Sequence, residues 1–144
     1  MKARPGDQSG SPTDGAPEVT FTLRDNAAIS EARHRAAGFL ARLHETHGIT
    51  VPSPAVEITL LVVSELVTNA RKYAPGLVLL HLRVVDRTVQ VTVWDTAPDM
   101  PQVSAADPRR IGRHGLEIVK ALVQRFEIRP EGMGKRITGH IAMA

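Results

Sequence analysis

Two polar residues of one predicted helix have types and spacing that could do chemistry. Glu65 and Asn69 stand four residues apart in the stretch SELVTNARKYA, residues 64–74 of the 144-residue chain. A helix turns about 100° per residue, so it places both on one side, at the rim between core and solvent. A carboxylate can accept a proton and an amide oxygen can bind a hard cation. Ordinary solvated helix residues would show the same spacing.

A second carboxylate, Asp95, ends a stretch in which apolar and polar residues alternate. Asp95 shares the parity of Val89, Val91 and Val93, so a regular strand directs its side chain toward the buried face. A buried carboxylate needs a donor, because leaving it unpaired is costly. The donor could be the exocyclic amine of a ligand. Alternatively, Asp95 caps the turn that follows it.

A third feature is the pair of glycines Gly112 and Gly115, immediately before a short apolar stretch with helical spacing. Glycine lets backbone N–H groups approach a ligand, and a helix N-terminus favours an anion. Arg109, Arg110 and Arg113 add positive charge beside the junction. The arrangement suits phosphate, although a plain connector could have the same composition. The chain contains no Walker motif of the form G-x-x-x-x-G-K-[ST].

The composition limits which functions these residues could serve. The net charge is only +3, and one Trp, one Tyr and three Phe leave little aromatic surface for stacking on bases. We therefore expect no direct contact with nucleic acid. The absence of cysteine excludes disulfides and thiolate chemistry. No apolar run is long enough to span a bilayer and no secretory signal is present, so we expect a cytoplasmic protein without membrane contact.

The elements that position these residues follow from periodicity and turn signals. Residues 1–17 are polar and rich in Gly, Pro and Ser, which predicts a disordered tail before one domain over 18–144. Apolar spacing predicts helices over 27–47, 54–72 and 115–123. Alternation predicts strands over 19–23, 78–85, 89–95, 125–129 and 135–143, with Asp86–Thr88 as a hairpin turn. The segregated order of helices and antiparallel strands favours an α+β two-layer sandwich.

The segment over 96–114 breaks the periodic pattern with Pro, Asp, Ser, Arg and Gly. A loop of this length is longer than compact domains usually carry, and such loops are often functional lids. We therefore expect it to close over a site formed by the neighbouring helix and strand ends.

In this order and at this spacing, the three features resemble the histidine-kinase-like ATPase (GHKL) superfamily, which includes DNA gyrase and the MutL-type and chaperone ATPases. Residues 65–74 are similar to its N box, VWDTAP at 93–98 to the G1 box, and GRHGLEIV at 112–119 to the G2 box at the end of the ATP lid. The similarity covers about residues 19–143. It implies the Bergerat ATP-binding fold, with a mixed, mostly antiparallel sheet covered on one face by helices.

The resemblance implies ATP and Mg²⁺ as cofactors and gives each motif residue a role. Asn69 would complete the Mg²⁺ shell, Glu65 would act as the catalytic base, and Asp95 would accept the adenine amino group. The remaining residues of the implied nucleotide site are Lys72, Ala97, Gly112, Arg113, Gly115 and Leu116, with the glycines and Lys72 near phosphate.

Within this superfamily the sequence S-E-L-V-T-N-A is most similar to that of the bacterial anti-sigma-factor serine kinases. That resemblance implies a protein serine/threonine kinase that binds a sigma factor, phosphorylates a small anti-anti-sigma (STAS-type) antagonist, regulates transcription and forms a homodimer. Two alternatives stay open: a non-catalytic ATP-binding or protein-binding regulatory module of the same fold, and a simple ATP hydrolase.

The sequence departs from the family pattern on the adenine side. Ala97 and Asp99 stand where the G1 box usually has glycines, and Lys135 follows Gly134 where the family often has threonine. The G2 segment also has two residues between its glycines. These departures favour ATP binding over rapid turnover.

Overall fold

The computed structural model describes residues 15–24, 28–73, 77–96, 114–132 and 134–143. The predicted elements are all present, with bounds that differ from the prediction by at most two residues. Residues 1–14 of the predicted tail and residues 97–113 of the predicted lid lie outside the described residues. The described elements are β1 (Glu18–Leu23), α1 (Ala28–His47), α2 (Ser53–Tyr73), β2 (Val78–Val85), β3 (Thr88–Asp95), α3 (His114–Leu122), β4 (Arg125–Glu131) and β5 (Gly134–Ala142).

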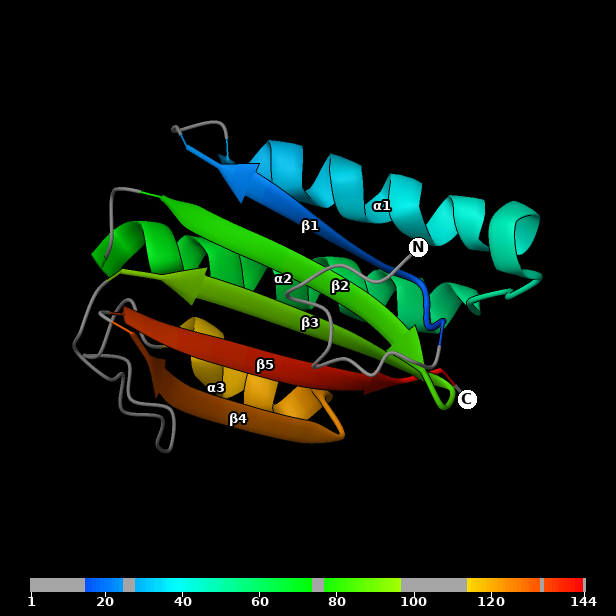
Figure 1. The fold of residues 1–144 in the computed structure, drawn as a ribbon. Coiled ribbons are helices and arrows are strands. Elements are labelled where there is room, and N and C mark those ends of the chain that lie inside the picture. The colour runs from blue at the N-terminus through cyan, green and yellow to red at the C-terminus, as the bar shows by residue number, and fades with distance from the viewer. Residues whose placement is uncertain (1–14, 25–27, 74–76, 97–113, 133, 144) are drawn as a thin grey trace.

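The five described strands form one sheet in the order β1-β2-β3-β5-β4. Figure 1 shows α1, α2 and α3 together on one face of this sheet, which confirms the predicted α+β sandwich. The sheet was expected to be mixed and mostly antiparallel, and each of the described pairings is antiparallel. The reason is that β1, β3 and β4 run in one direction and alternate in the sheet with β2 and β5, which run in the other.

The hairpin between β2 and β3 turns in two residues, whereas the sequence predicted a three-residue turn over Asp86–Thr88. Thr88 pairs with Val85 in the strand ladder, which leaves Asp86 and Arg87 as the turn. Their φ angles are 52° and 59°, as in the turns that match the twist of a hairpin. The prediction missed this turn because neither residue is Gly or Asn, the residues that usually adopt it.

Helix α2 lies between α1 and α3 and carries the N-box residues (Figure 1). It begins at Ser53 and Pro54, as the capping serine and the first-turn proline predicted. Its apolar side packs on the sheet, so residues at the edges of that side come close to the strands and to α3. None of the three described helices has the length and apolar character required to cross a membrane.

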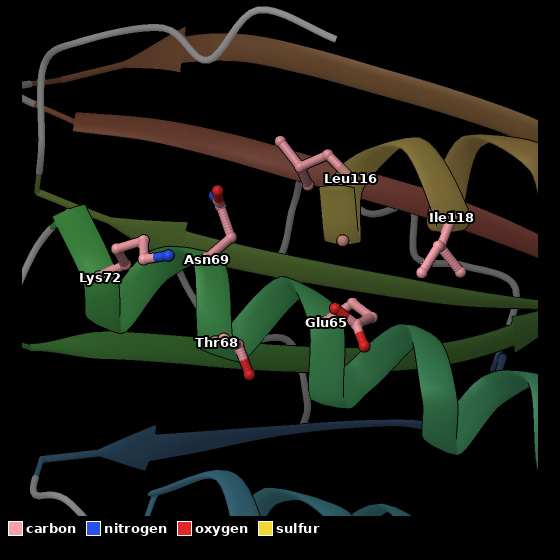
Figure 2. Close-up of a pocket in the computed structure, with 7 residues that line it drawn as sticks. Glu65, Thr68, Asn69, Lys72, Leu116 and Ile118 are labelled. Carbon is pink, nitrogen blue, oxygen red and sulfur yellow. The ribbon is translucent and has the colours of Figure 1, made fainter. Parts of the chain in front are cut away.

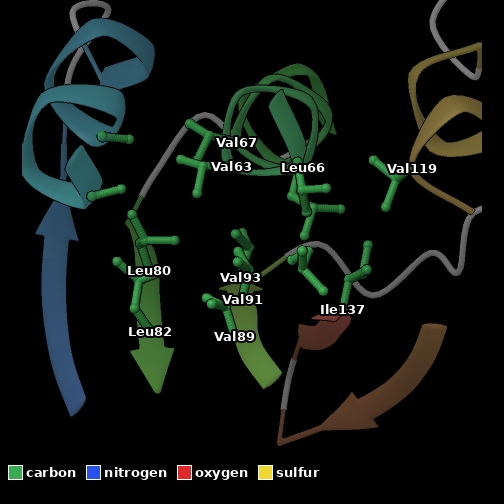
Figure 3. Packing of buried hydrophobic residues seen from close by; sticks show 14 of the residues in the cluster. Val63, Leu66, Val67, Leu80, Leu82, Val89, Val91, Val93, Val119 and Ile137 are labelled. Atoms are coloured by element: carbon green, nitrogen blue, oxygen red, sulfur yellow. The ribbon is translucent and has the colours of Figure 1, made fainter. Parts of the chain in front are cut away.

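The hydrophobic core fills the space between the helices and the sheet (Figure 3). In β3 every second side chain is buried, including Val89, Val91 and Val93. These side chains point toward the helix layer, which includes Leu66 of α2 (Figure 3). Burial of each such side chain contributes roughly 1.5–3 kcal/mol, and a one-residue slip would expose all of them. This register therefore fixes the buried orientation of Asp95, as its parity predicted.

Candidate functional site

A pocket of about 270 Å³ opens between the C-terminal half of α2 and the start of α3. Figure 2 shows side chains from both helices around it. Segments that are far apart in the sequence meet here because α2 and α3 pack side by side on the same face of the sheet. The lining consists of Glu65, Thr68, Asn69 and Lys72 from α2, and of Gly115, Leu116 and Ile118 from α3.

Asn69 is the most unusual residue of this pocket. Its side chain is 5% exposed, and neither amide atom has a hydrogen-bond partner in the structure's described part. Figure 2 shows the amide directed away from α2 into the pocket. A buried polar group without a partner costs roughly 1–3 kcal/mol, so such groups usually meet a ligand or ordered water. Asn69 thus lies deeper than the predicted rim, and its burial does not fit a solvated helix residue.

Glu65 lies one turn before Asn69 on α2 and is partly buried. Figure 2 shows its side chain on the side of α2 that faces α3. The carboxylate lies against Gly115 in the first turn of α3. A Cβ atom at Gly115 would overlap Oε1 of Glu65. Gly115 therefore has a steric role, because it lets a carboxylate rest against the positive end of a helix.

Asp95 finds its donor within the chain. Nζ of Lys135 donates to Oδ1 of Asp95 over 3.0 Å, and both side chains are 1% exposed. The two residues are partners across the antiparallel β3–β5 ladder. Next to Lys135, a Cβ atom at Gly134 would overlap the backbone carbonyl oxygen of Asp95, so only glycine permits this approach. Neither residue of the ion pair belongs to the lining of the pocket.

Residues 21–138 of the chain match the family model for the histidine kinase-like ATPase domain. The match includes α2, the end of β3, α3 and the start of β5, and therefore every described element of the site. The chain belongs to the histidine kinase-like ATPase family. No curated protein matches it.

A solved structure supports the fold assignment of this histidine kinase-like ATPase domain. The chain is similar to the crystal structure of the RsbU and RsbW domains of Rv1364c from Mycobacterium tuberculosis, with a TM-score of 0.64 and 20% sequence identity. The similarity covers 88% of this chain and 32% of that one, so the chain spans about a third of the length of the chain that it matches. At this level of identity the comparison shows a shared fold.

The pocket of this histidine kinase-like ATPase fits the phosphate end of a nucleotide with its cation. The amide oxygen of Asn69 is a hard ligand without a partner among the described residues, which leaves it available to a Mg²⁺ ion. The described residues contain no group of three or more His, Cys, Asp or Glu that could hold a metal. A cation at Asn69 would therefore take most of its ligands from water and phosphate, which Mg²⁺ favours. Lys72 adds a positive charge at the exposed end of α2.

The structure brings together most of the predicted site residues that it describes. Glu65, Asn69, Lys72, Gly115 and Leu116 all line the pocket. Asp95 lies at the end of the neighbouring strand rather than in this lining. Predicted site residues outside the described part of the chain are Ala97, Gly112 and Arg113.

Sequence reasoning missed three residues of this region. Thr68 and Ile118 line the pocket, and helical spacing could have found both: Thr68 precedes Asn69, and Ile118 follows Gly115 by three residues. Lys135 was noted only as a departure from the family pattern. The sequence placed Lys135 at the start of one predicted strand and Asp95 at the end of another. It did not show that these two strands are neighbours, so the ion pair could not be predicted.

Proposed function

We propose that the chain is an ATP-binding anti-sigma factor with serine protein kinase activity toward a small anti-anti-sigma antagonist of the STAS type. The observation that carries the proposal is the buried amide of Asn69, which has no partner among the described residues and lies beside Glu65 in the pocket of a histidine kinase-like ATPase. The sequence of residues 64–70, which is similar to that of anti-sigma-factor kinases, supports the choice of this subgroup.

In this proposal each residue of the pocket has one task at the phosphate end of the nucleotide. Bound Mg-ATP supplies a γ-phosphoryl group whose negative charge the cation partly neutralises. Asn69 holds the cation through its amide oxygen, and Lys72 balances phosphate charge from the end of α2. The backbone at Gly115, in the first turn of α3, lies against phosphate.

Glu65 acts on the acceptor. A serine hydroxyl of the antagonist attacks the γ-phosphoryl group, and Glu65 takes the hydroxyl proton as the bond to phosphorus forms and ADP leaves. The partly buried position of the carboxylate against Gly115 keeps it beside the cation site, where the attacking oxygen must arrive. Asp95 accepts the adenine amino group at the other end of the nucleotide.

The proposed partners are a sigma factor and the antagonist. The protein sequesters the sigma factor, and the unphosphorylated antagonist releases the sigma factor from it. Phosphorylation of the antagonist ends this release. A homodimer, which the resemblance to anti-sigma-factor kinases implies, and a cytoplasmic location belong to the same proposal.

The decisive experiment incubates the protein with labelled Mg-ATP and candidate antagonist proteins. Phosphoserine on the antagonist, lost in Glu65→Gln, is the expected result. Glu57→Gln is the matched control, because Glu57 is an exposed glutamate of the same helix. Tight ATP binding without transfer would favour the non-catalytic module, and phosphate release without an acceptor would favour an ATP hydrolase.

A separate measurement tests the metal assignment. Asn69→Ala removes the amide oxygen, so we expect the variant to lose Mg²⁺-dependent ATP binding in titration calorimetry. An ATP affinity in magnesium equal to that of the wild type would refute the assignment of Asn69.

A further inference from the structure

The buried ammonium group of Lys135 has more donors than the described residues accept. An ammonium carries three N–H donors. Among the residues that the structure describes, the one acceptor found for it is Oδ1 of Asp95. Lys135 is 1% exposed, so its other donors are shielded from bulk water. Buried donors without acceptors are costly, which makes this end of the sheet a place where an acceptor on a ligand would be stabilising.

The position of this ion pair is fixed by the backbone. Asp95 ends β3, Lys135 begins β5, and the two are register partners. Gly134 allows the close approach of the strands, because a side chain there would overlap the carbonyl oxygen of Asp95. Figure 2 shows that β3 ends and β5 begins beside the part of α2 that carries Asn69 and Lys72. The pair therefore flanks the pocket on its sheet side.

We propose that Lys135 is a base-recognition residue that donates to ring nitrogen N1 of adenine while Asp95 accepts from the adjacent amino group. The inference rests on the proposed binding of an adenine nucleotide and deepens it. Adenine presents its amino donor and its N1 acceptor side by side on one edge. A carboxylate alone can pair with only the donor, whereas an ammonium–carboxylate pair matches both groups and uses a donor that Lys135 has left over.

The simpler alternative is that Lys135 only neutralises Asp95. In that case the ammonium contributes to folding but not to recognition, and the N1 atom of the base does not matter for binding. The two interpretations differ in one atom of the ligand, so an edited ligand can separate them without any change to the protein.

The first test compares Mg-ADP with the Mg complex of 1-deaza-ADP, in which a C–H group replaces N1, on the wild-type protein by titration calorimetry. We expect the analogue to bind roughly 10- to 100-fold more weakly, because it loses a charge-assisted hydrogen bond and leaves a buried donor unpaired. Equal affinities would overturn the inference. Failure of ADP itself to bind would refute the proposed function, and the inference with it.

The second test assigns the discrimination to Lys135. In Lys135→Met the affinity ratio of ADP to its analogue should fall to about one. Lys135→Gln serves as the second variant, since its amide can still hydrogen-bond Asp95 and support the fold; its ratio should fall to a few-fold, because the bond is no longer charge-assisted. Arg136→Met, at the exposed neighbouring position, should keep the wild-type ratio. A wild-type ratio in either folded Lys135 variant would overturn the inference.

Discussion

Replacing Lys135 with methionine removes a buried positive charge but keeps a side chain of similar length. Asp95 then carries its negative charge at 1% exposure without the ammonium that lies 3.0 Å away in the native protein. Loss of one partner of a buried ion pair costs about 3–5 kcal/mol. Domains of this size have a free energy of unfolding of about 5–15 kcal/mol in total. We therefore expect the melting temperature to fall by about 10–20 °C.

Urea denaturation provides the assay, with the fluorescence of Trp94 as the signal, because the chain has one tryptophan and it precedes Asp95. The double variant Asp95→Val/Lys135→Met carries neither charge, so its stability should return close to that of the wild type. Arg136→Met is the control. The Arg136–Glu131 ion pair spans 3.1 Å with side chains 43% and 48% exposed, and its loss should cost less than about 1 kcal/mol.

Two results would refute this reasoning. One is a loss of less than about 1 kcal/mol in Lys135→Met, as for the exposed control pair. The other is a double variant whose loss of unfolding free energy equals the sum of the losses in Asp95→Val and in Lys135→Met, because additivity means that the two charges do not interact. Either result would show that water reaches the pair and that its burial does not determine its energetics.

Three further substitutions separate stability from function. Gly115→Ala displaces only the flexible end of Glu65, so the free energy of unfolding in urea should stay within about 0.5 kcal/mol of wild type while phosphoserine formation falls roughly tenfold or more; equal initial rates would contradict this. Gly134→Ala meets the rigid carbonyl of Asp95 instead, so it should cost at least about 2 kcal/mol in the same unfolding assay. Asn69→Leu removes a buried amide that has no partner in the described part of the chain, so its melting temperature should rise by a few degrees as nucleotide binding is lost, and a lower melting temperature would count against the unpartnered state.

Local patterns were sufficient to predict the elements of this fold. The alternation in residues 78–85 and 88–95 reflects one buried face, and it predicted both strands and the inward orientation of Asp95. The serine and proline at residues 53 and 54 located the start of α2, because helix capping depends on neighbouring residues. Each of these signals lies within one turn or one strand of the feature that it predicts.

Pairing between distant segments could not be predicted in the same way. No local pattern shows which strand lies next to β3. In the structure this neighbour is β5 and not β4, and the Asp95–Lys135 ion pair depends on that order. The parity of Asp95 showed that it needs a donor, but a lysine 40 positions away in the chain is not visible to periodicity. The sequence therefore predicted the proximity of Glu65 and Asn69, which share helix α2, but not the ion pair that depends on the order of strands in the sheet.

The two carboxylates of the site differ in how a glycine constrains them, and this difference matches the roles proposed for them. Gly115 faces the terminal atoms of Glu65, so its missing side chain leaves room for the carboxylate against the first turn of α3. Gly134 faces the backbone of Asp95, and the ion pair with Lys135 fixes the side chain as well. Recognition of a base edge needs fixed hydrogen-bond partners, because an immobilised group loses little conformational entropy when the ligand binds. A carboxylate base held beside the phosphate end and an ion pair fixed at the sheet end therefore match the proposed roles in transfer and recognition.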